Sequence, residues 1–297
     1  MEYQLLGKSG LKISRIGFGA MSLELNNPVN ETLLNKALDG GINFFDTADL
    51  YQEGWNETLL GRAFRKKRKQ IILATKVGNQ WRADGSGWDW NPSKEYILSA
   101  VDKSLRRLQT DYIDLYQLHG GTLEDPIEDI IEAFELLKSS GKILHYGISS
   151  IRPNVIREYV KRSDIISVMM QYSLLDRRPE ESMLAFLLEN KLGVLARGTL
   201  AKGLLISKPP EPFLNYSPGQ VEKMKAAIKT MSHGLSPFET ATQYVLQHPP
   251  VCSAVIGIRT MEQLQDALDA AKLKSQTYLN MKELGAVLPP NKYIDHR

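Results

Sequence analysis

Four polar residues of the chain fit the chemistry of proton transfer to a carbonyl group. Asp46, Lys76 and His119 each lie at or near the end of a short apolar run, and Tyr51 comes five residues after Asp46. A phenol is a weak proton donor at neutral pH, and a neighbouring ammonium improves it by favouring the phenolate. Lys76 is the candidate ammonium for Tyr51. Asp46 would then hold Lys76 charged, and His119 would orient the carbonyl oxygen.

Each of these residues also has an ordinary structural explanation. An aspartate after a strand commonly caps a turn, a lysine at a strand end is usually solvated, and a single histidine or tyrosine usually packs locally. The four residues together are stronger evidence for a functional site than any one of them alone. His119 shares one strand face with Leu115 and Gln117 because side chains alternate along a strand, so it points inward if Leu115 does.

The elements that must position these residues follow from the pattern of apolar runs. Short apolar runs alternate with segments of helical period, which is typical of repeated βα units. The predicted strands are residues 16–19, 43–46, 71–77, 113–119, 145–149, 165–172, 193–197 and 254–256. Eight strands match a (β/α)8 TIM barrel, an α/β fold whose active sites lie at the carboxyl ends of the strands.

The remaining segments complete the predicted architecture. We expect a single domain over residues 1–297, with an N-terminal hairpin around residues 7–10. Two connections, residues 78–91 and 198–219, are longer than ordinary βα loops and follow the third and seventh strands. Long loops in compact domains are usually functional. Helix starts are predicted at Asp125, Ser217 and Ser236, each of which precedes a proline.

Three segments carry a resemblance to a known family. Residues 43–51 read NFFDTADLY, residues 73–76 read LATK and residues 111–119 read DYIDLYQLH. They resemble the signatures of the aldo-keto reductases, and the likeness runs from about residue 5 to residue 271. The resemblance implies a barrel that binds NADP(H) and reduces aldehydes or ketones to alcohols, with hydride from nicotinamide C4. It implies a catalytic tetrad, with Tyr51 as the general acid: Asp46, Tyr51, Lys76 and His119.

The same resemblance implies contacts to the nicotinamide. Ser149 and Ser150 resemble the family's carboxamide-binding residues, with Ser150 in place of asparagine. Met169 holds the place of the usual glutamine, and Gln171 directly precedes Tyr172. The resemblance places the ring of Tyr172 against the nicotinamide, while the residue that replaces the glutamine stays open.

Two further segments resemble the family's phosphate-binding and adenosine-binding motifs. Residues 197–203 resemble the loop that covers the pyrophosphate, whose candidate ligands are Arg197, Gly198, Leu200 and Lys202. Residues 257–263 resemble the adenosine-side motif, with Gly257, Arg259 and Gln263 as candidates. A helix start offers free amides, and the guanidinium of Arg259 suits the 2′-phosphate of NADPH. Gln263 either contacts the ligand or completes a capping box with Thr260.

The first long connection contains three of the four tryptophans, namely Trp81, Trp88 and Trp90. They either form an aromatic wall of the substrate pocket or a cluster that pins the loop. The sequence leaves both alternatives open. It also leaves open the natural substrate, the role of the C-terminal tail and the oligomeric state.

Composition narrows the remaining classes of function. The 297 residues carry 37 Lys and Arg against 34 Asp and Glu, a balance too even for a nucleic-acid-binding protein. No G-x-G-x-x-G follows a strand, and no metalloprotease or P-loop motif is present, so we expect no metal. A single cysteine, Cys252, excludes an intramolecular disulfide. No signal peptide or membrane segment is predicted, so a cytoplasmic enzyme is expected.

Two alternatives to the reductase stay open at this point. One is an NADP(H)-binding regulatory subunit with vestigial catalysis, as in the potassium-channel β subunits that resemble this family. The other is a barrel aldolase with Lys76 as a Schiff-base nucleophile, which requires a neutral lysine. The proposed partner Asp46 would hold Lys76 charged and so disfavours the aldolase.

Overall fold

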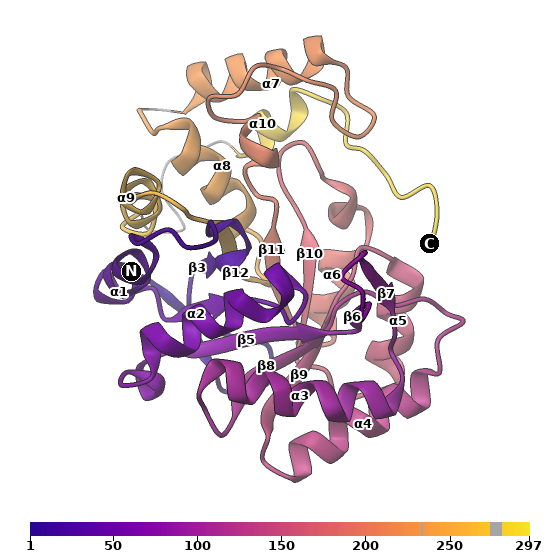
Figure 1. The fold of residues 1–297 in the computed structure, drawn as a ribbon. Helices are drawn as coiled ribbons and strands as arrows, with labels where there is room; N and C mark the ends of the chain where they lie inside the picture. The colour runs from indigo at the N-terminus through magenta and orange to yellow at the C-terminus, as the bar shows by residue number, and fades with distance from the viewer. Residues whose placement is uncertain (233, 274–280) are drawn as a thin grey trace.

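A closed barrel of eight parallel strands forms the core of the computed structural model, which describes residues 1–232, 234–273 and 281–297 (Figure 1). The strands, each overlapping one predicted strand, are β3 (Ile16–Gly19), β4 (Phe44–Asp46), β5 (Ile72–Val77), β8 (Ile113–Leu118), β9 (Ile143–Ser149), β10 (Ser167–Gln171), β11 (Gly193–Arg197) and β12 (Val251–Gly257). Strand β12 pairs with β3, and β9 pairs with β10, which closes the sheet. The predicted (β/α)8 barrel is confirmed.

Helices surround the barrel. They are α1 (Asn30–Asp39), α2 (Trp55–Phe64), α3 (Lys94–Leu108), α4 (Ile127–Ser139), α5 (Pro153–Arg162), α6 (Met183–Glu189), α7 (Pro218–Met231), α8 (Pro237–Leu246), α9 (Met261–Ala270) and α10 (Met281–Ala286). Figure 1 shows α7 and α10 together at the top of the view, away from α3 and α4 at the bottom. Across the described residues, no helix combines the length and apolar composition needed to cross a bilayer.

The helix starts agree with the predicted capping signals in two places. Ser217 and Ser236 each accept a hydrogen bond from the backbone N–H three residues later, and complete capping boxes open α7 and α8. The predicted cap at Asp125 is wrong, because α4 begins after Pro126 without a side-chain cap. The Asp125 carboxylate instead accepts hydrogen bonds from the Thr122 N–H at 2.7 Å and from Trp90 Nε1 at 2.9 Å.

An apolar cluster fills the barrel interior below its mouth. The structure contains the predicted N-terminal hairpin, formed by β1 (Tyr3–Leu5) and β2 (Lys12–Ser14). Leu6, which follows β1, and Ile13 of β2 belong to this cluster. The buried members are Leu6, Ile13, Phe44, Ala74, Leu115, Ile166, Met169, Leu195, Cys252 and Val255. Because interior side chains recur every second residue, the residues two positions beyond Phe44, Ala74, Leu115, Met169 and Leu195 reach the mouth.

The two long connections contain ordered structure. The first holds an antiparallel hairpin of β6 (Asn79–Trp81) and β7 (Trp88–Trp90), in which Trp81 lies opposite Trp88. The second holds the 3-10 turn η5 (Ala201–Gly203) ahead of α7. Both follow strands of the barrel and lie at its carboxyl end, as the sequence predicted. The other 3-10 turns are η1 (Ala20–Ser22), η2 (Tyr51–Gly54), η3 (Arg68–Gln70) and η4 (Arg178–Glu181).

Gly61 of α2 permits a close contact with the end of α3. A Cβ atom at residue 61 would stand 2.3 Å from the Arg107 carbonyl oxygen and 2.6 Å from the Leu108 carbonyl carbon. Alanine is the better helix former by about 1 kcal/mol, but these neighbours are backbone atoms that cannot rotate away. We expect Gly61→Ala to lower the free energy of unfolding by about 1–3 kcal/mol, measured by urea denaturation.

Gly219 of α7 provides the matched control. A Cβ atom there meets only the Ser217 Oγ, at 4.0 Å. Gly219→Ala is expected to raise the free energy of unfolding by about 0.4–1 kcal/mol, because it restricts the unfolded chain at no steric cost. Equal responses of the two variants would contradict the close contact between α2 and α3.

Candidate active site

The neighbouring strands β4 and β5 place a buried ion pair in the mouth of the barrel. Lys76 Nζ lies 2.6 Å from Asp46 Oδ2 and 2.7 Å from the Thr47 carbonyl oxygen. The side chains of Lys76 and Asp46 are only 1% and 7% exposed. Burial lowers the pKa of Lys76, but its interactions with Asp46 and Tyr51 outweigh burial and raise the pKa above its ordinary value. Lys76 therefore keeps its charge at neutral pH.

The other two residues of the predicted tetrad lie beside this pair. Lys76 Nζ is 5.2 Å from the centroid of the Tyr51 ring. The rings of Tyr51 and His119 meet edge to face, with centroids 5.9 Å apart and an interplanar angle of 81°. The structure thus brings together all four residues that sequence reasoning selected. It adds Gln117, whose Nε2 donates to Asp46 Oδ1 at 3.4 Å. The sequence could have indicated Gln117, because this residue shares a strand face with His119.

The backbone between Asp46 and Tyr51 is held against the end of β5. The Thr47 N–H donates to the Ala74 carbonyl oxygen at 2.9 Å, and the Asp49 N–H donates to the Lys76 carbonyl oxygen at 3.3 Å. Positive φ angles at Gln52, Glu53 and Gly54 then turn the chain into α2. Tyr51 is fixed at the rim of the barrel by this turn, with its half-buried ring above Lys76.

His119 is electrostatically unusual. Burial lowers its pKa to about 3, and the charges of Lys76 and Arg197 add to the effect. Its Nδ1 atom is buried and has no hydrogen-bond partner among the described residues. The imidazole is therefore neutral at physiological pH, which leaves it able to donate one hydrogen bond and accept another.

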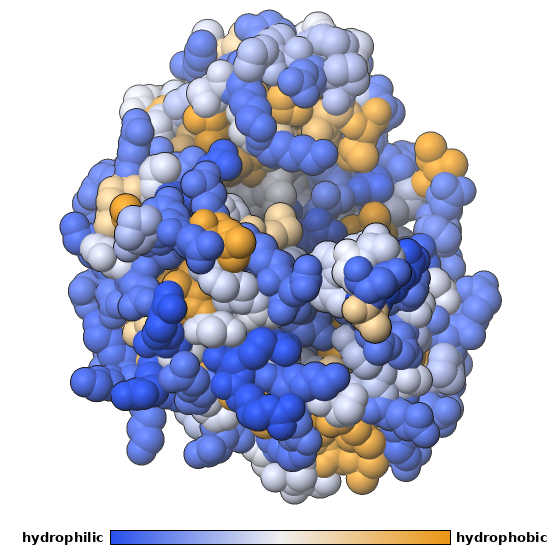
Figure 2. Space-filling view, in the orientation of Figure 1, coloured by the Kyte–Doolittle hydropathy of each residue, from blue (hydrophilic) through white to orange (hydrophobic). Residues whose placement is uncertain are grey.

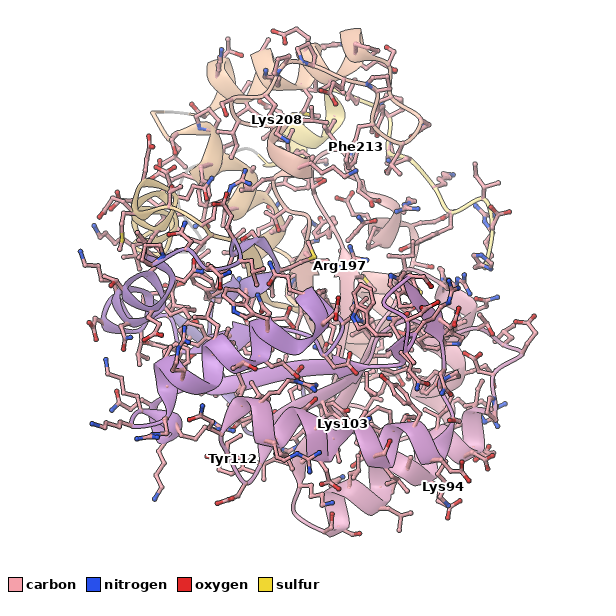
Figure 3. The ribbon with its side chains drawn as sticks, viewed as in Figure 1. Lys94, Lys103, Tyr112, Arg197, Lys208 and Phe213 are labelled. Carbon is pink, nitrogen blue, oxygen red and sulfur yellow. The ribbon has the colours of Figure 1, made fainter. Side chains whose placement is uncertain are left out.

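Arg197 brings a second cation to the mouth. It follows Leu195 of the interior cluster by two residues on β11, and it pairs with Gln171 across β10 and β11. Its guanidinium acts on Tyr51 and Asp46 through its charge, and burial lowers its pKa. Figure 3 shows Arg197 at the end of β11 toward the centre of the molecule, whereas Lys94 and Lys103 lie along α3 on the outside. Figure 2 shows a hollow near the centre of the same face.

The residues predicted to contact the nicotinamide lie at the ends of two neighbouring strands, β9 and β10. Ser149 and Ser150 lie buried at the end of β9, where the Ser150 N–H donates to the Met169 carbonyl oxygen at 3.0 Å. Met169 belongs to the apolar cluster below the mouth, and Gln171, two residues later, faces the mouth beside Arg197. Because the two residues lie on the same face of β10, Gln171 is at the level of the tetrad and Met169 is below it.

Tyr172 does not face the mouth. Its ring is fully buried among the helices outside the barrel, where its hydroxyl donates to Glu180 Oε1 at 2.8 Å and its ring meets that of Tyr244 on α8. The predicted stacking of Tyr172 on a nicotinamide does not agree with this placement. The physical reason is alternation, since the residue after an inward Gln171 must point outward.

The candidate phosphate-binding residues lie on turns at the carboxyl ends of β11 and β12. Gly198 and Lys202 have φ angles of 70° and 59°, and Leu200 lies between them against the core. These angles bend the chain sharply after β11. Lys202 is exposed on this turn.

The start of α9 follows Gly257, at the end of β12. Thr260 caps α9 by accepting from the Gln263 N–H at 3.2 Å. The Gln263 side chain accepts from the Arg259 N–H at 3.0 Å, so it closes the turn at the start of the helix. Of the two alternatives for Gln263, this contact favours the structural one. Arg259 itself is exposed.

The three tryptophans have different surroundings. Trp90 Nε1 donates to the Asp125 carboxylate, and its ring packs on the core, so Trp90 pins the hairpin. Trp81 Nε1 donates to the Leu50 carbonyl oxygen at 3.0 Å, one residue before Tyr51. Trp88 is 49% exposed. Trp81 is therefore the tryptophan best placed to line the mouth.

The closed barrel and the Tyr, Lys, Asp and His group at its mouth define a barrel oxidoreductase. The Aldo/keto reductase family profile matches residues 15–286, and the chain belongs to this family.

Relatives of known sequence and structure agree with this assignment. The chain is 48% identical to the uncharacterized oxidoreductase YqkF of Bacillus subtilis (strain 168) over all of both proteins. It is 30% identical to the L-galactose dehydrogenase of Arabidopsis thaliana, covering 99% of this chain and 96% of that one. The holo form of aldo-keto reductase AKR11C1 from Bacillus halodurans superposes with a TM-score of 0.95 at 45% identity, covering 100% of this chain and 99% of that one.

The depressed pKa of His119 predicts a pH-dependent contribution to stability. In the unfolded chain His119 binds a proton below about pH 6.5, whereas in the folded protein it stays neutral down to about pH 3. The free energy of unfolding should therefore rise with pH between these values and then level off. From about pH 8 to about pH 5, wild type should lose up to about 2 kcal/mol more than His119→Gln, measured by urea denaturation. Parallel losses in both proteins would contradict a neutral His119.

Proposed function

We propose that this protein uses NADPH to reduce the carbonyl group of a small aldehyde or ketone to an alcohol. The observation that carries the proposal is the charged Lys76, bonded to Asp46 at 2.6 Å and 5.2 Å from the Tyr51 ring centroid. An ammonium in this position stabilises a developing phenolate and so makes the hydroxyl a better proton donor. The same arrangement leaves the lysine protonated, which disfavours a Schiff-base mechanism.

Each residue of the group has a distinct task in this reaction. When bound, NADPH supplies the reducing equivalent to the carbonyl carbon. Tyr51 donates its hydroxyl proton to the carbonyl oxygen, and Lys76 stabilises the phenolate that remains. Asp46 keeps Lys76 charged and in place. The neutral His119 donates a hydrogen bond that fixes the carbonyl oxygen near the Tyr51 hydroxyl.

The residues at the mouth fit a dinucleotide of this kind. The side chain of Arg197 is half buried, yet it has neither a hydrogen bond nor an ion pair with another described residue. The hydroxyl of Thr199 is buried and has no partner in the described part of the chain. Ser149, Ser150 and Gln171 would hold the nicotinamide end, and Arg197, Gly198, Leu200 and Lys202 would hold the phosphates. Gly257 and Arg259, at the amino end of α9, would hold the adenosine end.

We further propose that residues 1–297 act as one functional unit on a small-molecule substrate in the cytoplasm. The near-neutral charge balance supports a partner other than nucleic acid. Cys252 is buried and forms no disulfide, which is consistent with a reducing compartment. Burial raises the pKa of its thiol and so makes the thiol unreactive.

Removal of the Tyr51 hydroxyl tests the proposed proton donor. Tyr51→Phe should lower kcat for a reactive aldehyde by about 10²–10⁴-fold, because proton donation to the carbonyl oxygen is lost. Loss of NADPH absorbance measures the rate, and quenching of tryptophan fluorescence by NADPH should show unchanged cofactor affinity. Tyr3→Phe is the control, because Tyr3 lies in the N-terminal hairpin, where its hydroxyl donates to the carbonyl oxygen of Gly41 after α1. A Tyr51→Phe variant that keeps the wild-type rate would refute the assignment.

Arg259 tests the choice between NADPH and NADH. The exposed guanidinium would pair with the 2′-phosphate that only NADPH carries. Arg259→Ala should therefore raise KM for NADPH by about 10–100-fold and leave KM for NADH nearly unchanged. Steady-state kinetics with each cofactor measure the effect, with the exposed Arg106→Ala on α3 as the control. Equal changes with both cofactors would show that Arg259 does not contact the 2′-phosphate.

A further inference from the structure

Asp49 lies between Asp46 and Tyr51 in sequence, but its carboxyl group faces the outside of the barrel wall. It is 7% exposed and packs toward α2 and α3. Its Oδ1 atom is buried and has no hydrogen-bond partner among the described residues. Its Oδ2 atom lies 3.3 Å from the Tyr96 hydroxyl of α3. The proposed mechanism does not use this carboxyl group.

The groups around Asp49 do not supply it with a free cation. Those facing it are Glu57 of α2, Tyr96 and Arg107 of α3, and Tyr116 of β8. Glu57 is fully buried, and Arg107 is already committed to it, with Nε and Nη2 at 2.7 Å and 2.6 Å from Oε2. The cluster therefore places two buried carboxyl groups beside one guanidinium, and that guanidinium pairs with Glu57.

The hydroxyl of Tyr96 indicates which form Asp49 takes. This hydroxyl lies 3.2 Å from the Asn79 carbonyl oxygen as well as 3.3 Å from Asp49 Oδ2. A hydroxyl has one hydrogen to donate, and a carbonyl oxygen can only accept. If Tyr96 donates to Asn79, its contact with Asp49 is a hydrogen bond only when the carboxyl group carries the proton. A neutral acid satisfies both contacts, whereas a carboxylate leaves two acceptors competing for one hydrogen.

We propose that Asp49 carries a proton in the folded enzyme and that this neutral acid is a positioning residue for Tyr51. The Asp49 N–H holds the turn to the Lys76 carbonyl oxygen, and the neighbouring Leu50 carbonyl oxygen accepts from Trp81. The Tyr96 hydroxyl and the Leu50 N–H lie beside Asp49, but Oδ1 has no partner among the described residues, so a charge there would need water or further donors, because burying a poorly bonded carboxylate is costly. Opening the turn to supply them would move Tyr51 away from Lys76. The kinetic part of this inference rests on the proposed function.

Electrostatics support the neutral form. Burial raises the pKa of Asp49 from its ordinary 3.8 to about 8, with a further rise from the charge of Glu57 and opposing effects of Arg107, the Tyr96 hydroxyl and the Leu50 N–H. Between these two values the folded protein holds a proton that the unfolded chain has released. The free energy of unfolding therefore falls as pH rises from about 4 to about 8, and the effect is constant above that range.

Asp49→Asn tests the proposal, because the amide imitates the neutral acid and its Nδ2 can donate to Tyr96. The first two measurements need no substrate. Infrared difference spectra between about pH 6 and about pH 10 should show a carboxylic acid C=O band in wild type that Asp49→Asn lacks. Urea denaturation should show that the variant has lost a pH dependence worth up to one bound proton between about pH 4 and 8.

Kinetics then test the positioning role. From about pH 7 to about pH 9, kcat of the wild type should fall about tenfold, and that of Asp49→Asn less than about twofold. Asp102→Asn is the matched control, because Asp102 pairs with Lys142 at the surface and should behave as wild type. If the amide variant does not fold, Asp49→Ser, which keeps a smaller donor, replaces it in all three measurements.

The outcomes separate this inference from the proposed function. An unchanged carboxylic acid band and unfolding slope in Asp49→Asn would overturn the protonated form of Asp49. Identical pH profiles of kcat in the two proteins would overturn the positioning role. A protein that reduces no carbonyl compound would defeat the proposed function and with it the positioning role, while the infrared and unfolding results would still decide the protonation state of Asp49.

Discussion

The site depends on one buried ion pair, that of Lys76 with Asp46. Removing both charges from water costs several kcal/mol per ion, and only close, well-bonded geometry offsets that cost. The register of β4 and β5 provides this geometry, since Asp46 lies opposite Ala74, and Lys76 follows Ala74 on the same strand face. The Thr47 carbonyl oxygen and Gln117 supply further hydrogen bonds to the pair. The charged lysine, and with it the proposed role of Tyr51, follows from this arrangement.

The barrel interior is divided into an apolar floor and a polar mouth by the two-residue period of its strands. Ala74, Leu115, Met169 and Leu195 belong to the floor, and the residues two positions later belong to the mouth: Lys76, Gln117, Gln171 and Arg197. His119 continues the same face beyond β8. The tight floor excludes water from below, which strengthens the electrostatic interactions above it.

A second polar layer lies behind the first, between the barrel wall and the helices. Thr75, the neighbour of Lys76, donates to Glu57 at 2.6 Å, and Glu57 pairs with Arg107 of α3. The close packing of α2 on α3 at Gly61 holds these partners together. The turn that carries Asp49 and Tyr51 therefore lies between two ion pairs. The inner one joins Lys76 to Asp46, and the outer one joins Arg107 to Glu57. This explains how a segment without regular strand structure can hold the proposed proton donor, Tyr51, in one place.

The sequence alone determined the features that depend on neighbouring residues. Apolar runs and their spacing predicted the eight barrel strands. The two serines that precede prolines predicted the starts of α7 and α8. The spacing of strand ends predicted which four residues meet. Tertiary structure decided the features that depend on packing across the chain. Tyr172 points out of the barrel, Asp125 bonds to Trp90 instead of capping α4, and Asp49 shares an enclosed space with Glu57. Periodicity is local and can be read from the sequence, whereas burial and the choice of hydrogen-bond partner arise only when distant segments exclude water together.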